Sequence, residues 1–217
     1  MGASDKEVET MQAVQSGIQI PELERLEPIH TKGLQRVFGA LRLAMGWTFL
    51  WAFLDKAFAL GFSTGRVLNE AGETVKIDFF GPDAWINGAS PTAGAVGFAL
   101  KGPLADNIQT VAGYQMTQAG PTVGGWLDWV YMLSLLLIGL GLMTGVMTRI
   151  AAVGGIVWMA TFYLGTAIWP EHNPFLDDHI VYAIVLVGMM LANAGRYYGL
   201  GKIWQRVGFV TDRRYLH

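Results

Sequence analysis

The chain has 217 residues and a formal net charge of -2, with 52% apolar but only 15% charged residues. Soluble domains average about 25% charged residues, and the deficit here lies in long apolar blocks, which predicts an integral membrane protein. The chain contains no cysteine, which excludes disulfides, thiolate zinc sites and cysteine-ligated iron–sulfur clusters carried by this chain. The near-neutral charge gives no indication of nucleic-acid binding.

The first apolar block carries an unusual set of charges. Residues 1–33 are polar and of mixed charge, and we predict a cytoplasmic N-terminal arm there. The first membrane span is predicted over residues 34–62, with Arg42 near one end and the pair Asp55 and Lys56 towards the other. An ionisable residue at membrane depth costs about 2.5–3.5 kcal/mol on insertion scales, so such residues usually face a bundle interior or a polar cavity.

A long connection over residues 63–125, rich in Gly, Pro, Asp and Asn, follows the first span. It is too long for a simple turn, and three pieces of it predict local order. Residues 75–80 suggest a short strand. Residues 93–100 are apolar but too few to span a bilayer, so they either dip into the membrane interface or cap the bundle. Residues 103–115 have the apolar periodicity of an amphipathic helix on the membrane surface.

Three further spans are predicted over residues 126–147, 150–169 and 179–198. The second and third are separated by only two residues, which predicts a tight antiparallel hairpin. The final segment, 201–217, is basic and aromatic, and we expect it to be a cytoplasmic tail. Residues 34–200 would then form one membrane domain between the arm and the tail.

The distribution of lysine and arginine predicts the orientation. Ten of these residues lie on one side of the predicted spans: Lys6, Arg25, Lys32, Arg36, Arg149, Arg196, Lys202, Arg206, Arg213 and Arg214. Only Arg66, Lys76 and Lys101 lie on the other side. We therefore expect an all-α, multi-pass protein of a bacterial-type cytoplasmic (plasma) membrane. It would be a four-transmembrane-helix bundle with both termini cytoplasmic and a partly ordered external loop between the first two helices.

Several short motifs, in order, resemble the DoxX/DoxD family of four-helix membrane proteins over residues 34–205. In the first span they are Leu41-Arg42-Leu43, Gly46, Phe49, Trp51 and Leu54-Asp55-Lys56. In the connections they are Asn87 to Gly94, Lys101-Gly102-Pro103, Asn173 to His179 and Gly199-Leu200-Gly201. The predicted N-terminal arm has no counterpart in this pattern.

The resemblance implies a redox role. The family is associated with thiosulfate:quinone oxidoreductase, in which a DoxD-type membrane subunit works beside a small partner subunit. Other members are known as DoxX membrane proteins linked to sulfur or redox homeostasis. We accordingly expect quinone as a membrane co-substrate and a sulfur compound as donor at the outer face. The expected partners are the lipid bilayer, a small subunit or sulfur-transfer protein, and further copies of this chain.

Arg42 and Lys56 are the first candidates for ligand binding. They are fourteen residues apart, which places them within about 40° of one another around a helix. Two cations on one face suit an anion such as thiosulfate near Lys56, or the polar head of a quinone. The alternative is that Arg42 reaches cytoplasmic lipid phosphates and that Asp55 and Lys56 are satisfied inside the bundle.

Asp177, Asp178 and His179 stand where the fourth span begins. Asp177 is a natural helix cap, whereas Asp178 beside His179 suggests a proton relay for quinone chemistry. We therefore select Asp55, Lys56, Asp178 and His179 as candidate catalytic residues.

Arg42, Trp47, Trp51 and Lys56 are the candidates for binding a quinone or other substrate. For Trp47 and Trp51, packing in the bundle is the alternative role. No metal, haem or flavin site is expected. Two functions remain open: a subunit of a quinone-linked oxidoreductase, and a non-enzymatic scaffold in a redox or respiratory complex.

Overall fold

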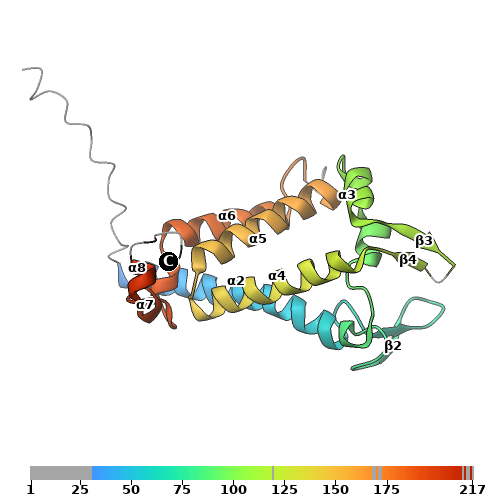
Figure 1. Cartoon of the computed structure of the whole chain (residues 1–217), viewed down its shortest axis with the longest axis horizontal. Helices are drawn as coiled ribbons and strands as arrows, with labels where there is room; N and C mark the ends of the chain where they lie inside the picture. Colours follow the sequence, from blue (N-terminus) through green and yellow to red (C-terminus); the bar gives the residue numbers. More distant parts are fainter. Residues whose placement is uncertain are drawn as a thin grey trace, which may run out of the picture.

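The structure, a computed structural model, describes residues 31–118, 120–167, 170, 173–211, 213 and 216. Nearly all of the predicted N-terminal arm lies outside the described residues. Four antiparallel helices dominate the described part (Figure 1). They are α2 (Lys32–Phe58), α4 (Gly125–Thr144), α5 (Thr148–Phe162) and α6 (Asp178–Leu191).

Three of these helices are long and apolar enough to cross a membrane: α2, α4, and α5 together with the π-helical segment η3 (Tyr163–Ala167) that continues it. At 1.5 Å per residue, 20 residues cover the ~30 Å of a bilayer core. The fourth helix, α6, is apolar but has only 14 residues. These helices support a membrane environment for the chain.

The helices pack in pairs, α2 against α4 and α5 against α6, and α4 joins the two pairs. The α2–α4 crossing is close because glycines lie at it. A Cβ atom on Gly139 would lie 2.7 Å from the backbone nitrogen of Leu50, and one on Gly46 would lie 2.8 Å from that of Met143. The core beside this crossing is apolar, and its fully buried members are Met132, Leu142, Ala152, Leu186, Met189 and Ala194.

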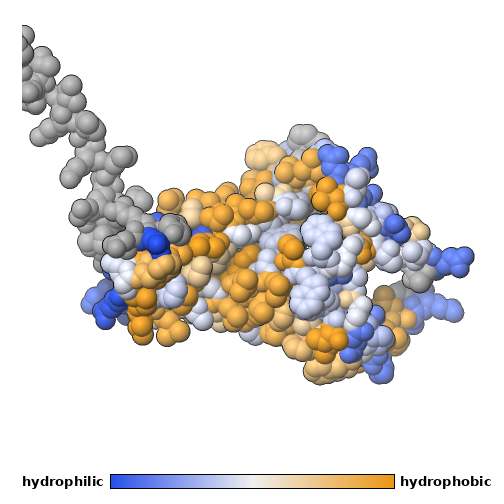
Figure 2. Space-filling model, in the orientation of Figure 1, coloured by the Kyte–Doolittle hydropathy of each residue, from blue (hydrophilic) through white to orange (hydrophobic). Residues whose placement is uncertain are grey.

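The outer faces of the helices are apolar as well. On α4, the exposed side chains Val130, Leu133, Leu137 and Leu140 repeat at helical spacing, and Val181, Ile184 and Leu191 do so on α6. Figure 2 shows an apolar band over the middle of the bundle, with polar residues gathered at its ends. A helix that is apolar all round is either buried in protein or faces lipid. The exposure of these side chains is consistent with a lipid bilayer around the helices.

The predicted fourth span, 179–198, is too long. The helix ends at Leu191 because Asn193 adopts a left-handed conformation with φ of 48°. A 3-10 turn, η4 (Ala194–Arg196), follows it, and then two short helices, α7 (Gly201–Trp204) and α8 (Gly208–Thr211). These elements lie at the same end of the bundle as the start of α2 (Figure 1).

The long connection is ordered at the opposite end of the bundle (Figure 1). It contains two antiparallel strand pairs, β1 (Arg66–Leu68) with β2 (Thr74–Ile77), and β3 (Gln115–Thr117) with β4 (Gly120–Thr122). Between them lie a 3-10 turn, η1 (Trp85–Asn87), a π-helical segment, η2 (Ala95–Ala99), and the helix α3 (Ala105–Ala112). The strand predicted over 75–80 corresponds to β2, which begins one residue earlier and ends three residues earlier, and the helix predicted over 103–115 corresponds to the shorter α3.

Candidate functional site

A cavity of about 420 Å³ opens where the long connection meets the bundle. Its walls come from the end of α2, from α4, from α5 with η3, and from the connection. Most of its lining side chains are apolar or aromatic; the members used below are Lys56, Thr92, Val96, Tyr131, Trp158 and Phe162. Ligand pockets of this kind, apolar with few polar groups, typically measure ~300–1,000 Å³. We call this hollow the Lys56 cavity.

Lys56 is the one charged side chain among the residues that line this cavity. It is half-buried, and its Nζ donates a hydrogen bond to Ser63 Oγ at 3.0 Å. An ammonium has three donors, so two remain for a ligand after this bond. The cavity is therefore suited to an apolar molecule that carries a hydrogen-bond acceptor or a negative charge at one end.

Tyr131 on α4 is a second polar group of the Lys56 cavity, which the sequence analysis did not select. Its ring packs edge-to-face on Trp158 and Phe162, with centroids 5.1 and 6.3 Å away. Among the residues that the structure describes, none forms a hydrogen bond with its hydroxyl. Buried tyrosine hydroxyls usually find one, so this group is available to a ligand. The signal that the sequence offered, a lone tyrosine within the apolar second span, was not used.

Two π-helical segments meet at the Lys56 cavity. Val96 of η2 and Thr166 of η3 both line it. The connection is bonded to η3 directly, since the backbone nitrogens of Lys101 and Gly102 donate to Gly165 O at 2.9 and 2.8 Å. Single π-helical turns are frequent at functional sites. Residues 93–100 thus lie against the end of the bundle, as expected for a cap.

Asp128 holds this cap on the bundle, and the sequence analysis missed it. This buried carboxylate in the first turn of α4 accepts hydrogen bonds from Ser90 Oγ at 2.9 Å, from Thr92 N at 3.1 Å and from Thr92 Oγ1 at 2.6 Å. Charge-assisted bonds of this type are about twice as strong as neutral ones. An acid at the start of an apolar span was the available signal, but its partners lie 36 and 38 residues away in the chain.

The Asp55 carboxylate binds the backbone of the turn that follows α2. Asp55 is 1% exposed, and its carboxylate accepts bonds from the backbone nitrogens of Phe62 at 2.9 Å and Ser63 at 2.8 Å. These bonds end α2 at Phe58, earlier than the predicted 62, by turning the chain back on its last helical turn. Within the described chain, Asp55 and Lys56 form no direct ion pair and are linked through the Ser63 hydroxyl. Asp55 was selected as a candidate catalytic residue, and these bonds correspond instead to the alternative, in which it is satisfied inside the chain.

Arg42 is fully buried at the other end of α2, so it does not reach lipid phosphates, contrary to the alternative considered above. Its guanidinium donates to four backbone carbonyls, those of Leu142, Met143, Tyr197 and Tyr198. The first two belong to the C-terminal end of α4, where the helix dipole favours a cation. The guanidinium thus ties α2, α4 and the segment after η4 together, far along the helix from Lys56.

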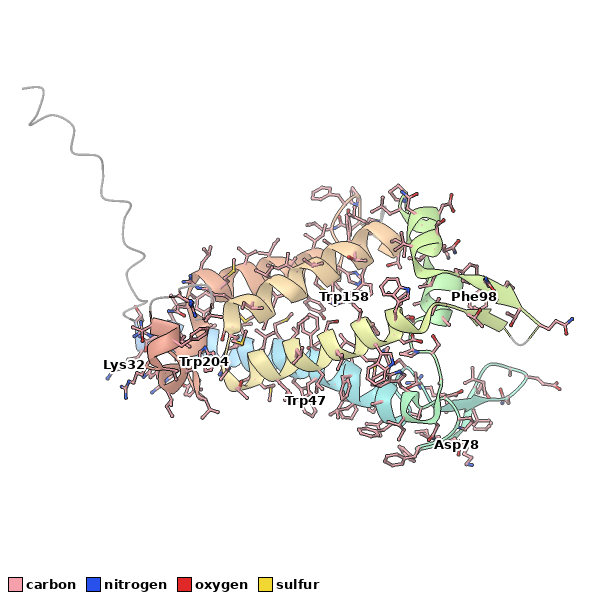
Figure 3. All side chains as sticks on the ribbon, in the orientation of Figure 1. Lys32, Trp47, Asp78, Phe98, Trp158 and Trp204 are labelled. Carbon is pink, nitrogen blue, oxygen red and sulfur yellow. The ribbon has the colours of Figure 1, made fainter. Side chains whose placement is uncertain are left out.

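Trp47 and Trp51 do not line the Lys56 cavity. Trp47 is 48% exposed on the outside of α2 (Figure 3), and its ring lies 5.5 Å from that of Trp51, which packs edge-on to Phe62. The aromatic walls of the cavity come instead from Trp158 and Phe162 on α5, whose rings stack 5.5 Å apart. The Trp158 indole nitrogen is held by Ser134 Oγ at 2.6 Å.

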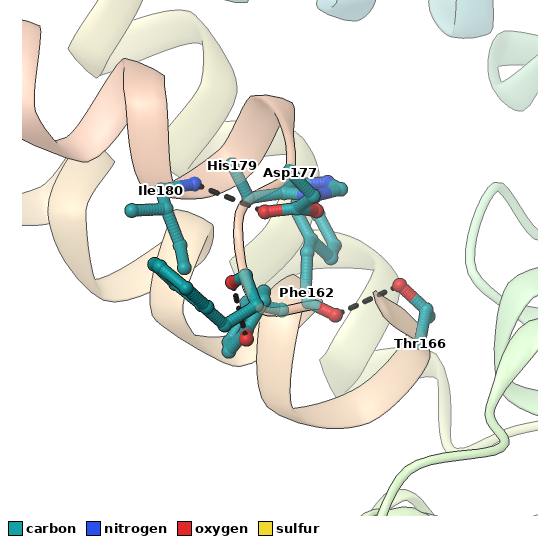
Figure 4. Close-up of polar contacts among 7 residues, drawn as sticks. Phe162, Thr166, Asp177, His179 and Ile180 are labelled. Carbon is teal, nitrogen blue, oxygen red and sulfur yellow. Dashed lines mark hydrogen bonds and ion pairs between the residues drawn. The ribbon is translucent and has the colours of Figure 1, made fainter. Parts of the chain in front are cut away.

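His179 is bonded to Asp177 and not to Asp178, the neighbour considered in the sequence analysis. Its Nδ1 lies 2.5 Å from Asp177 Oδ2, while Asp177 Oδ1 accepts from Ile180 N at 3.1 Å (Figure 4). The cap residue turns its carboxylate over the first helical turn, where residue 179 lies. Asp178 is exposed. The predicted cap at Asp177 is therefore confirmed, and this cap also orients the imidazole.

The structure does not bring His179 and Lys56 into one cavity. His179 borders a second, apolar hollow of about 410 Å³ between α5 and α6, lined by other residues of α5. Phe162 lines the Lys56 cavity and its ring lies 5.6 Å from the His179 ring. The Phe162 side chain thus contacts both the Lys56 cavity and the His179 ring. In the described ranges, no group of three or more His, Asp or Glu is placed to hold a metal ion.

Comparisons of the chain with models of protein families, with curated proteins and with solved structures find no match.

Proposed function

We propose that the chain is a DoxX-like membrane subunit that binds a quinone in the Lys56 cavity. It would form part of an oxidoreductase acting on thiosulfate or a related sulfur compound at the outer face. The observation that carries the proposal is the pairing of an apolar, aromatic-walled cavity with one lysine amine. A quinone ring is flat and apolar and has carbonyl oxygens that accept hydrogen bonds. The cavity offers matching walls and the Lys56 and Tyr131 donors.

The residues of the cavity have distinct parts in this proposal. Trp158 and Phe162 stack on the ring and exclude water. Lys56 donates a hydrogen bond to one carbonyl, and its positive charge stabilises negative charge that develops there. Tyr131 donates to a polar oxygen of the ligand. A bound quinone would supply the capacity to accept two electrons from the sulfur compound, for example from two thiosulfate ions that join as tetrathionate, and two protons from water.

The proposal includes the orientation of the chain in the membrane. The excess of lysine and arginine on the side of α7 and α8 favours both termini inside a bacterial-type cytoplasmic membrane, with α2, α4, α5 and α6 as four spans. The Lys56 cavity then opens in the outer leaflet, beneath the connection. A small partner subunit would approach over this connection, which carries exposed side chains such as Phe79, Phe80 and Ile86.

The experiment measures quinone content and thiosulfate-dependent quinone reduction in the purified chain, alone and with its candidate partner. Lys56→Met should lower quinone affinity and activity together. The matched control is Lys101→Met, which removes an exposed amine in the same connection that does not line the cavity. Absence of quinone and of activity in every preparation would exclude the redox role.

One set of observations favours the alternative, a non-enzymatic scaffold of a redox or respiratory complex. Three buried charged side chains form hydrogen bonds with other groups of the same chain: Arg42, Asp55 and Asp128. Buried charges that specify a fold are bonded in this way. Lys56 is the exception, because it also lines the cavity. If the chain is a scaffold, the wild-type protein and the Lys56→Met variant should bind the partner equally well. Neither protein should bind quinone.

A further inference from the structure

Five cations gather at the end of the bundle opposite the Lys56 cavity. They line two adjoining hollows of about 310 and 480 Å³: Lys32 and Arg36 border the first, Arg206 the second, and Arg196 and Lys202 both. The residues come from the start of α2, from η4, from α7 and from the turn after it. Figure 3 shows the labelled Lys32 and Trp204 together at this end. We call the two hollows the basic groove.

The groove is built on a fixed backbone. The Arg42 guanidinium holds the carbonyls of Tyr197 and Tyr198, and Leu200 N donates to Thr144 O at 2.8 Å. At Gly201 the chain passes so near Gly195 that an added Cβ would meet its carbonyl oxygen. The segment that carries Arg196 and Lys202 is therefore fastened to α2 and α4, and the backbone positions of these two residues relative to α2 are set before any ligand binds.

The charges of the basic groove are not compensated by acids within the described part of the chain. The residues that line the two hollows include no Asp or Glu. The ion pairs found among described residues, Lys76 with Asp78 and His179 with Asp177, lie elsewhere. All five cations are exposed. Like charges held together on a rigid surface repel one another and create a positive potential, which attracts an anion.

Apolar side chains beside the groove indicate which anion. Leu34 and Val37 on α2 are 44% and 53% exposed, and Leu200 and Ile203 next to Lys202 are 53% and 64% exposed. Figure 2 shows apolar and polar surface side by side at this end. A free inorganic anion makes no use of such apolar surface. A phospholipid uses both, because its phosphate meets the cations while its acyl chains cover the apolar side chains.

We propose that the basic groove binds an anionic phospholipid, with its phosphate between Arg196, Lys202 and Arg36 and its acyl chains along α2 and α7. The two adjoining hollows share two cations, so a headgroup with two phosphates fits them better than a headgroup with one. Cardiolipin is thus bound more tightly than phosphatidylglycerol, and both more tightly than phosphatidylcholine. This site is independent of the quinone proposed for the Lys56 cavity.

The test uses the full chain in detergent micelles, titrated with each of these three lipids and followed by native mass spectrometry. The double variant Arg196→Gln with Lys202→Gln should lose roughly 25-fold in cardiolipin affinity, at about fivefold per cation. The matched control is Lys76→Gln with Lys101→Gln at the other end of the bundle, which should bind cardiolipin as wild type does. Arg36→Gln, on a separate element, should lose about fivefold, and thermal unfolding checks that each variant is folded.

Two results would overturn the proposal. Equal affinity for cardiolipin and phosphatidylcholine would mean that acidic residues of the chain itself, such as those in segment 1–30, neutralise the groove. Displacement of cardiolipin by millimolar inorganic phosphate, with equal affinity for phosphate alone, would mean a simple anion site. Retention of cardiolipin by wild type and control in phosphate, but not by the double variant, supports the lipid site.

Discussion

Asp55 and Lys56 are consecutive on α2, and both bond to the hydroxyl of Ser63. Asp55 Oδ2 accepts from Ser63 Oγ at 2.5 Å, and Lys56 Nζ donates to the same oxygen at 3.0 Å. The carboxylate is buried and faces the turn, whereas the amine is half-buried and borders the Lys56 cavity. One serine therefore couples a structural charge to the charge proposed to bind a ligand, and the two can be separated by mutation.

Asp55→Asn should destabilise the protein by about 2 kcal/mol. The amide that replaces one carboxylate oxygen cannot accept the bonds from Phe62 N and Ser63 N together, and bonds to a buried charged group contribute about 1.5–3 kcal/mol each. Thermal unfolding in detergent measures the loss. The matched control, Asp78→Asn, changes a carboxylate that is 41% exposed and should shift the transition little. Equal effects in the two variants would contradict the structural role of Asp55.

Asp128→Ala should loosen the cap of the Lys56 cavity without unfolding the helices. The change removes the acceptor of Ser90 Oγ, Thr92 N and Thr92 Oγ1, so residues 90–102 lose their attachment to α4. Hydrogen exchange of these amides should accelerate, while that of the α2–α4 crossing stays slow. Thr92→Val removes one of the three bonds and should give a smaller acceleration. Unchanged exchange in Asp128→Ala would show that the contacts between the connection and η3 suffice.

The sequence predicted the elements of this fold better than it predicted their contacts. Apolar blocks indicate spans, and the cap at Asp177 follows from local chemistry, because its acceptor role involves residue 180 in the same turn. The end of α6 was missed because it depends on the left-handed conformation of Asn193, which an apolar pattern does not reveal. The local signal thus succeeded for the cap at Asp177, but not for the end of α6 or for the partner of His179.

The candidate site could be predicted only in part, for the same reason. Lys56 was found because a charge in an apolar span is conspicuous. Tyr131 and Trp158 were missed because which side of α4 and α5 faces the cavity is decided by packing. Arg42 and Lys56 are close in helical angle, yet the first meets carbonyls 100 and 156 residues away and the second meets a cavity. Helical spacing alone cannot tell these surroundings apart.

Arg42→Lys should destabilise the bundle by about 3 kcal/mol or more although it keeps the charge. A guanidinium spreads five donors over a plane, and here it reaches the carbonyls of two separate segments. An ammonium is more compact and leaves some of these buried carbonyls without a donor. Unfolding of the purified variant gives the magnitude, and Arg36→Lys, an exposed cation six residues earlier, is the control. A stability equal to wild type would show that charge alone matters at this position.

Asp177→Ala should cost about 1 kcal/mol through loss of the cap on α6, and Asp178→Ala considerably less. Asp177 accepts from Ile180 N and is bonded to His179 Nδ1, whereas Asp178 is exposed. Thermal unfolding distinguishes the two variants, and the His179 ring signals in NMR should shift only in Asp177→Ala. A larger effect of Asp178→Ala on both measurements would mean that Asp178, and not Asp177, caps α6 and binds His179, as the sequence analysis expected for His179.

Tyr131→Phe should lower quinone affinity about fivefold to tenfold and leave stability unchanged. The substitution keeps the ring that packs on Trp158 and removes a hydroxyl that forms no hydrogen bond with any described residue. Loss of one hydrogen bond to a ligand corresponds to about 1–1.4 kcal/mol. Quenching of Trp158 fluorescence by a soluble quinone analogue measures the affinity, with Trp158→Phe to identify the signal.

The control for Tyr131→Phe is Tyr163→Phe, which should lower stability and leave quinone affinity unchanged. Tyr163→Phe, at the first residue of η3, removes a hydroxyl that donates to Phe175 O at 2.7 Å and borders the second hollow instead of the Lys56 cavity. It should lower stability by about 0.5–1.5 kcal/mol and leave quinone affinity as in wild type. Reduced affinity in both variants would indicate that the bundle, and not the Tyr131 hydroxyl, is responsible. Unchanged affinity in Tyr131→Phe together with reduced affinity in Lys56→Met would leave Lys56 as the principal donor in the cavity.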